Sequence, residues 1–184
     1  MELIEQTLTR EEIYRGVVLH VVRDTVLLPN GKEAPREYCI HPGAVAIVAL
    51  CDDGTVLMER QYRHAHGRVF FEIPAGKLEG KEEPPLLAAA RELREETGAV
   101  AGKYTYLGPL DTTPALIDEH IHMYLAEELT FEEQSLDEDE FLNVERYPLA
   151  TLVEMVMRGE IADSKTQTAI LKTYLYKEGK FPLN

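Results

Sequence analysis

The sequence predicts an α+β protein in which strands and helices are mixed but do not alternate regularly. The first third of the chain is rich in β-branched and aliphatic stretches separated by turn residues, whereas helical spacing of apolar residues begins only near residue 84. The 184 residues suffice for one ordinary domain with a small additional unit. Apolar residues make up 45% of the chain, which is enough for a hydrophobic core.

The N-terminal part, residues 1–43, is predicted to form a small β subdomain. Residues 16–23 and 25–28 are expected to pair as a hairpin, followed by a Pro-Asn-Gly turn signal at 29–31, and residues 38–40 extend it. A two-stranded hairpin is only marginally stable in water. These strands are therefore expected to pack against another surface.

The remaining residues, 44–184, are predicted to form the main domain. It begins with residues 44–51, a run that is apolar on both faces and is therefore expected to be a buried central strand. Further strands are expected at residues 55–60, 69–73, 104–107 and 121–125, and helices at 84–96, 151–158 and 164–177. Gly98 is placed to end the first helix. The acidic segment 132–140 has neither strand nor helix periodicity and is expected to be a loop.

The overall charge limits the class of partner. A formal net charge of -14 disfavours binding to nucleic acid duplexes, which need clustered Lys and Arg. An acidic protein still binds a polyanionic small molecule when a divalent cation bridges the two. The longest apolar run, 44–51, is far below the roughly 20 residues of a membrane-spanning helix. The two cysteines lack metal-site spacing, and residues 1–15 are unlike a secretion signal, so we expect a cytoplasmic protein.

Three glutamates on the helix predicted from residue 84 carry the most chemical information. Glu92 and Glu96 are four residues apart and Glu95 is three from Glu92, so their carboxylates project from one side near the C-terminal end. Like charges at this spacing, at the negative end of the helix dipole, are unfavourable. A bound cation relieves this repulsion, and oxygen ligands alone favour Mg²⁺ or Mn²⁺. Alternatively, Arg91 and Arg94 pair with these glutamates on a solvated helix face.

The whole segment resembles the Nudix box, a loop-helix-loop motif. The matching residues, in order, are Gly76, Glu83, Arg91, Glu92, Leu93, Glu95, Glu96 and Gly98. Six residues separate Gly76 from Glu83 where five are usual, so the loop carries one extra residue. We assign Glu83 rather than Glu82 to the motif because it keeps the usual seven residues before Arg91.

The resemblance extends to the Nudix subgroup that hydrolyses ADP-ribose and other nucleoside diphosphate sugars. Residues 61–63, 72–76, 136–144 and 159–166 are similar to that subgroup, and Pro114 lies sixteen residues after Gly98, as is typical there. The resemblance implies an α/β/α sandwich with a mixed sheet and a small N-terminal β subdomain. It also implies a homodimer in which N-terminal strands are exchanged and residues of both chains complete the nucleotide pocket.

The resemblance implies a role for each site residue. Glu92 and Glu96 are the expected ligands of Mg²⁺, or of Mn²⁺, with the Ala75 carbonyl as a further oxygen. Glu83 or Glu95 is expected to support the metal, unless Glu95 mainly pairs with Arg91. The expected base is Glu138 or Glu140, which strand alternation places on one side of the acidic loop 136–141. Substrate binding is assigned to Arg63, Glu72 and Arg91: Arg63 binds phosphate, and Glu72 binds the ribose or base or orients the metal site.

The implied reaction is hydrolysis of a nucleoside diphosphate sugar, such as ADP-ribose or GDP-mannose, to a nucleoside monophosphate and a sugar phosphate. One alternative keeps the chemistry but changes the substrate to a dinucleoside polyphosphate, a nucleoside triphosphate or a capped RNA end. Another is a nucleotide-binding module that has lost catalysis. The intact acidic triplet of residues 92, 95 and 96 argues against the last alternative.

Overall fold

A computed structural model describes residues 3–136, 138, 140–180 and 182 of the chain. The chain divides into two units. The first unit consists of Met1–Pro42 together with Asp111–Glu119, and the second of Gly43–Leu110 together with His120–Asn184. The first unit therefore includes a segment from the middle of the chain, which the sequence did not predict.

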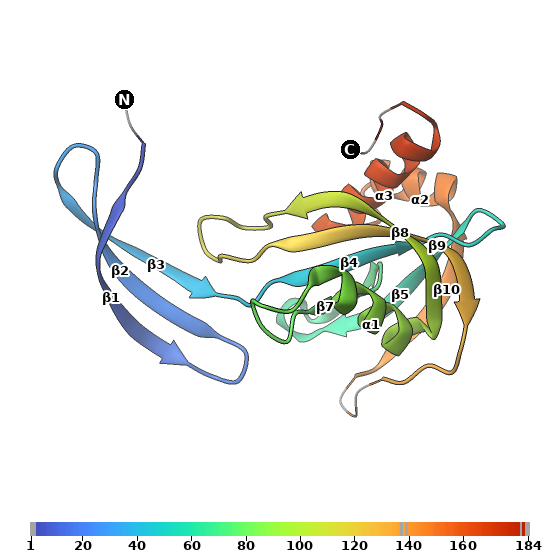
Figure 1. Cartoon of the computed structure of the whole chain (residues 1–184), viewed down its shortest axis with the longest axis horizontal. Helices are drawn as coiled ribbons and strands as arrows, with labels where there is room; N and C mark the ends of the chain where they lie inside the picture. Colours follow the sequence, from blue (N-terminus) through green and yellow to red (C-terminus); the bar gives the residue numbers. More distant parts are fainter. Residues whose placement is uncertain (1–2, 137, 139, 181, 183–184) are drawn as a thin grey trace. The chain divides into compact units, whose positions relative to one another are not determined.

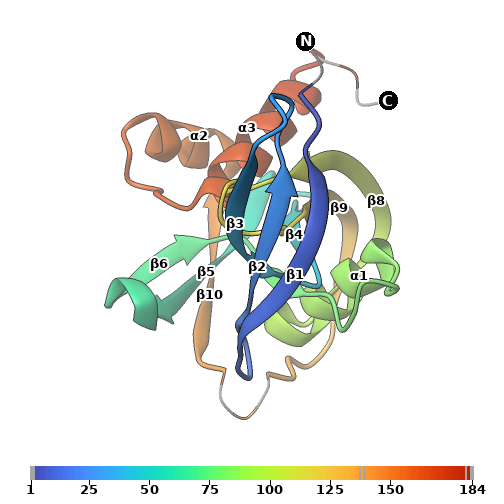
Figure 2. The same ribbon diagram turned by 90° about the vertical axis from the view of Figure 1, so that its left-hand side faces the viewer.

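The first unit is built on a three-stranded antiparallel sheet in the order β1-β2-β3 (Figure 2). Its strands are β1 (Gln6–Arg15), β2 (His20–Leu27) and β3 (Glu33–Ile40). The segment Asp111–Glu119 is attached to the end of β3, where the Cys39 N–H donates to the Leu116 carbonyl at 2.8 Å. The His41 N–H donates to the carboxylate of Asp118 at 2.6 Å.

The predicted hairpin of residues 16–23 and 25–28 is wrong. These residues contribute a single strand, β2, whose partner β1 the sequence did not predict, and the turn at 29–31 connects β2 to β3. Strand β1 escapes prediction because all ten of its residues are exposed, so it carries no alternation of buried and exposed positions. The charged residue Asp24, which interrupts the apolar pattern of β2, is itself buried.

The second unit contains two sheets. The four-stranded sheet has the order β7-β4-β9-β8, and the three-stranded sheet has the order β10-β5-β6. Their bounds are β4 (Ala44–Ala49), β5 (Thr55–Arg63), β6 (Arg68–Glu72), β7 (Ala75–Lys77), β8 (Ala99–Leu110), β9 (Ile121–Phe131) and β10 (Leu142–Pro148), with a short 3₁₀ helix at His64–His66. Strands β4 and β9 are parallel and the other pairs antiparallel, so the four-stranded sheet is mixed, as predicted. The short strands β7 and β10 were not predicted.

The predicted central strand is confirmed, because all six residues of β4 are buried. Ala46 and Val48 belong to one apolar cluster, which includes Leu152 of α2 (Leu149–Met157) and Ile170 of α3 (Ser164–Lys177). The alternate residues Val45, Ile47 and Ala49 belong to a second cluster, which includes Ala89 and Leu93 of α1 (Pro85–Thr97). The helices therefore cover both faces of the sheet, which gives the expected α/β/α sandwich (Figure 1).

Helix α1 begins and ends within one residue of the predicted bounds, 84–96. Pro85 occupies its first turn, and Gly98 ends it with a φ of 71° and an N–H that donates to the Arg94 carbonyl at 2.8 Å. A Cβ at residue 98 would lie 2.5 Å from the Glu132 carbonyl oxygen, so the close approach of the following loop also requires glycine. No helix among the described residues is long and apolar enough to cross a membrane.

Candidate active site

Glu92 and Glu96 lie one turn apart on α1, next to strand β7. Leu93 is fully buried in the apolar cluster beneath the helix, which fixes the rotation of α1 about its axis. Glu96 is only 2% exposed, and its Oε2 accepts the N–H of Ala75 at 2.9 Å. This contact uses the N–H of Ala75, whereas the sequence expectation concerned its carbonyl as a metal ligand.

The carboxylate of Glu92 occupies the space that a side chain at Gly76 would fill. A Cβ at residue 76 would lie 1.9 Å from the Cδ of Glu92, so any other residue there would displace this carboxylate from its position. Strand β7 is held by pairing with β4, with Gly76 opposite Val45. The glycine of the motif therefore lets the backbone of β7 approach the carboxylate of Glu92 closely.

Arg91 connects the loop that precedes α1 to the glutamates of the helix. Its Nη1 lies 2.9 Å from Oε1 of Glu92 and 3.2 Å from Oε2 of Glu95. Its Nη2 lies 3.5 Å from Oε1 of Glu83, whose other oxygen accepts the Glu79 N–H at 2.6 Å. Glu95 thus pairs with Arg91, as the alternative assignment of its role expected. Glu83 is in reach of the motif arginine despite the extra loop residue.

Glu59 is a further carboxylate that sequence reasoning missed. It lies on β5 directly opposite Glu72 of β6, is 1% exposed, and its Oε1 has no hydrogen-bond partner among the described residues. An unpaired buried carboxylate oxygen is costly. A sequence signal was present, because Glu59 continues the face of β5 that carries the buried Leu57.

Glu72 is buried between two cations. It is 2% exposed; one oxygen accepts from Nε of Arg63 at 2.8 Å, and the other accepts from Nζ of Lys165. Arg63 keeps a side chain that is 40% exposed. The structure thus brings Arg63 and Glu72 together as predicted, but both Glu72 oxygens are engaged by protein cations. Lys165 was not predicted as a site residue, although it lies in the stretch 159–166 that resembles the subgroup.

The carboxylates near α1 repel one another. Burial raises the pKa of Glu96 well above its usual range, with the charges of Glu59, Glu92 and Glu140 adding to the effect. Burial also raises the pKa of Glu92, although Arg91 opposes the shift. For Glu59, burial and the neighbouring Glu72 raise the pKa to about 8. A positive charge placed among these carboxylates would stabilise their ionised forms and lower their pKa values.

The two candidate bases occupy different environments. Glu140 is half-buried, its Oε1 accepts from Nε2 of Gln61 at 3.4 Å, and its charge contributes to the raised pKa of Glu96. Glu138 lies in a turn and is exposed. The expectation that strand alternation places both on one side is wrong, because β10 begins only at Leu142. The loop's Asp137 and Asp139 lie outside the described residues.

The donor chemistry of this cluster fits a hard divalent cation. Within the described ranges, no three His, Cys, Asp or Glu side chains are gathered into a ready set of metal ligands. The available donors are nevertheless carboxylate oxygens with raised pKa values, and Glu59 presents a buried oxygen that no described residue hydrogen-bonds. An all-oxygen donor set of this kind suits Mg²⁺ or Mn²⁺.

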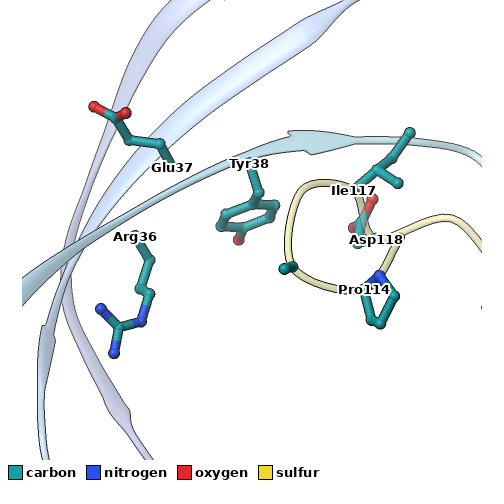
Figure 3. Close-up of a pocket in the computed structure, with 7 residues that line it drawn as sticks. Arg36, Glu37, Tyr38, Pro114, Ile117 and Asp118 are labelled. Carbon is teal, nitrogen blue, oxygen red and sulfur yellow. The ribbon is translucent and has the colours of Figure 1, made fainter. Parts of the chain in front are cut away.

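The first unit contains a separate pocket of about 440 Å³ beside the Asp111–Glu119 segment. Arg36 and Tyr38 of β3 project toward the same side of the strand, and the Tyr38 ring lies beside the loop that carries Pro114 (Figure 3). The lining residues are Arg36, Glu37, Tyr38, Pro114, Ala115, Ile117 and Asp118. An aromatic ring, an apolar wall and an arginine are suited to a flat, polar-edged ligand.

Two family profiles match adjoining parts of the chain. The profile of the NUDIX domain matches residues 40–167, and the profile of the nucleoside diphosphate sugar hydrolase N-terminal domain matches residues 5–38. The first match contains α1 with its glutamates, and the second contains β1, β2 and most of β3. The resemblance stated from the motif residues is thereby confirmed.

The chain is also similar to individual proteins over most of its length. The chain is 45% identical over 170 residues to the ADP-ribose pyrophosphatase of Bacillus subtilis, covering 91% of each chain. It is 40% identical over 168 residues to the methanol dehydrogenase activator of Bacillus methanolicus, covering 90% of each. A crystal structure of an ADP compounds hydrolase superposes with a TM-score of 0.83 over 98% of this chain and 100% of that one, at 22% identity, which shows the same fold.

Proposed function

This chain belongs to the NUDIX domain family and is a pyrophosphohydrolase of nucleoside diphosphate sugars, and we propose that ADP-ribose or a close analogue is its substrate. The products are a nucleoside monophosphate and a sugar phosphate. The observation that carries this proposal is the packing of Glu92 and Glu96 against β7, within a cluster whose carboxylates have raised pKa values. The identity to an ADP-ribose pyrophosphatase supports the choice of substrate.

Members of this family work with divalent metals, and we assign Mg²⁺ here, with Mn²⁺ as a substitute. Glu92, Glu96 and the Ala75 carbonyl would hold it, and Glu59 is the additional oxygen that the structure offers. When bound, the cation neutralises phosphate charge and lowers the pKa of water. Its positive charge also compensates the mutual repulsion of these carboxylates.

The chain's own side chains supply the remaining steps. Glu140 orients the attacking water and takes its proton, in keeping with its half-buried position and its electrostatic effect on Glu96. Arg63, whose side chain is 40% exposed, binds a non-bridging phosphate oxygen pair. Arg91 holds Glu83 and Glu95 and so fixes the loop before α1 in place. These assignments give Arg91 a structural rather than a substrate-binding role.

We further propose that the first unit binds the nucleobase and forms a homodimer. The pocket beside Tyr38 and Pro114 has the flat aromatic and apolar walls that a base requires. Strand β1 is an edge strand, and residues 3–19 expose many large apolar side chains. These are Leu3, Ile4, Leu8, Ile13, Tyr14, Val17, Val18 and Leu19. Such a surface is typical of a subunit interface.

The reaction is tested with a substrate panel. Purified protein is incubated with ADP-ribose, GDP-mannose, UDP-glucose, a dinucleoside polyphosphate and ATP, and phosphate released by an added phosphatase is measured with Mg²⁺, with Mn²⁺ and with excess EDTA. We expect the fastest hydrolysis with ADP-ribose and none in EDTA. Faster turnover of the polyphosphate or ATP would replace the substrate assignment, and full activity in EDTA would contradict the metal assignment.

The homodimer is tested by light scattering on the full-length chain. Truncation at residue 43 is a poor test, because Asp111–Glu119 folds with the N-terminal strands and would lose its partners. We expect the mass of a dimer, and expect that Leu8→Asp with Ile13→Asp lowers it to a monomer with weaker substrate affinity. A monomer mass for active wild-type protein would contradict the shared nucleotide pocket.

We also propose a cytoplasmic location. Both cysteines of the chain, Cys39 and Cys51, are free thiols, which is usual for proteins of a reducing compartment.

A further inference from the structure

We propose that Lys165 is a positioning residue that orients Arg63, through the buried carboxylate of Glu72, for binding the substrate diphosphate. This inference rests on the proposed function, because it assumes that Arg63 binds phosphate. It gives a role to the stretch 159–166, which no step of the proposed reaction uses.

The central contact is an ion-paired chain of three side chains. Glu72 is 2% exposed, and its two oxygens are divided between Nε of Arg63, at 2.8 Å, and Nζ of Lys165. Lys165 is 12% exposed, whereas Arg63 is 40% exposed. Lys165 is therefore the enclosed end of the chain and Arg63 the end open to a ligand.

The start of helix α3 holds Lys165 in place. Asp163 caps this helix by accepting the Thr166 N–H at 2.9 Å, and the same carboxylate oxygen lies 3.1 Å from Nζ of Lys165. Thr166, which is fully buried, accepts the backbone N–H of Ile73 at 3.0 Å through its Oγ1. Two adjacent residues of α3 thus bind two adjacent residues at the end of β6. The side chain of Glu72 and the backbone N–H of the next residue, Ile73, are therefore both held by the same helix end.

The position of Glu72 requires such a counter-charge. Glu72 lies directly opposite the buried Glu59 across the β5–β6 pair, and like charges at this position are destabilising. Lys165 and Arg63 both act against the raised pKa of Glu59. Without Lys165, one Glu72 oxygen would lose its cation, and Arg63 would remain as the charge partner in this ion-paired chain. Its guanidinium would then be drawn toward the carboxylate and away from the orientation that we assign to phosphate binding.

This arrangement predicts an effect on substrate binding more than on chemistry. Arg63 holds a phosphate oxygen in both the bound substrate and the transition state, so loss of its orientation raises KM with little change in kcat. A purely structural role for Lys165 would instead lower the amount of folded enzyme and leave KM unchanged.

The test compares four proteins with the wild type: Lys165→Met, Lys165→Arg, Lys177→Met and Glu72→Gln. Lys177 is the matched control, since it lies on the same helix and pairs with Glu127 at 2.8 Å in an exposed ion pair. With ADP-ribose and Mg²⁺ we expect Lys165→Met to raise KM on the order of 10-fold, with kcat within about 3-fold of wild type. Lys165→Arg should recover most of the loss because it restores a cation, and Lys177→Met should behave as wild type.

The double variant Glu72→Gln, Lys165→Met completes the test. It removes the buried charge together with its counter-ion, so it is expected to fold even if Lys165→Met alone does not. If Lys165 acts through Glu72, the double variant should have a KM less than about 2-fold above that of Glu72→Gln alone. A full additive increase there, or an unchanged KM in a folded Lys165→Met protein, would overturn the inference. A wild-type protein that hydrolyses no nucleoside diphosphate sugar would overturn the proposed function, and this inference with it.

Discussion

Both units of the molecule bury carboxylates, but with opposite electrostatic results. In the first unit, Asp24 is 3% exposed and forms two hydrogen bonds of 2.7 Å with the guanidinium of Arg10, which holds the pKa of that carboxyl below its usual range. In the second unit, burial and like-charged neighbours raise the pKa of Glu59 and Glu96. A fully paired carboxylate contributes to the stability of its sheet. A cluster of carboxylates with too few cationic partners favours the binding of a cation.

The comparison separates a structural carboxylate from a functional one without reference to the motif. Arg91 pairs with Glu92 and Glu95, and Lys165 pairs with Glu72, but Glu59 keeps an oxygen without a hydrogen-bond partner among the described residues. If Glu59 served stability alone, an apolar residue of similar volume would serve as well at this position. The contrast therefore predicts that neutralising the two kinds of carboxylate has opposite effects on activity and stability.

The largest expected effect follows neutralisation of the α1 glutamates. Glu92→Gln or Glu96→Gln should lower kcat for ADP-ribose by on the order of 10²-fold or more, because each removes a charged metal ligand. The same variants should melt at an equal or higher temperature than wild type in EDTA, because repulsion is relieved. Glu154→Gln, an exposed ion-pair residue of α2, is the control. Near-normal turnover of either site variant would remove the glutamates from the mechanism.

A somewhat smaller effect is expected in the acidic loop. Glu140→Gln should lower kcat by about 10²-fold with little change in KM, because a general base acts chiefly in the transition state. Glu138→Gln should remain close to wild type, since Glu138 is exposed in a turn. Steady-state kinetics of both variants distinguish them. If Glu138→Gln carries the loss instead, the assignment of the base is reversed; if neither does, the base lies outside this loop.

The smallest effect concerns Asp24, and it is on stability alone. Because its pKa is lowered in the folded state, Asp24 stabilises the protein above the unfolded pKa of about 4, and this contribution disappears as the pH falls through the lower folded value. Asp24→Asn should therefore lower the urea midpoint at pH 7. The difference from wild type should shrink progressively below about pH 4.

The control for this measurement is Glu37→Gln, which removes an exposed partner of Arg23 on the same sheet and should change the midpoint little. A difference between Asp24→Asn and wild type that stays constant down to pH 3 would show that the Arg10–Asp24 pair is not the source of the stability.

The sequence predicts those parts of the fold whose signal is local. Strand β4 is apolar on both faces, and α1 combines apolar spacing with a Gly that adopts a positive φ at its end, so both were found. Strand β1 was missed because every one of its residues is exposed and its pairing with β2 gives no apolar pattern. The segment Asp111–Glu119 joins the first unit through backbone hydrogen bonds and one contact of the Asp118 carboxylate, and neither gives a periodic pattern in the sequence.

The site divides in the same way. The residues of the Nudix box lie in one continuous stretch, from β7 through the following loop to the end of α1, so their spacing alone brought them together. Glu59 and Lys165 become site residues only through long-range contacts; Lys165 lies 93 residues from the Glu72 that it binds. Arg91 illustrates a third case, because the sequence left open whether it binds substrate or pairs with the glutamates of its own helix. It holds three glutamates, which the spacing of charges on a helix shows only in part.

The most direct test of the central claim, that the buried carboxylates of α1 form a divalent cation site, is calorimetric titration of Mg²⁺ into the metal-free protein without substrate. We expect saturable Mg²⁺ binding to wild type and to Glu154→Gln, and an affinity at least about 10-fold weaker for Glu96→Gln. Equal Mg²⁺ affinities for wild type and Glu96→Gln would contradict it.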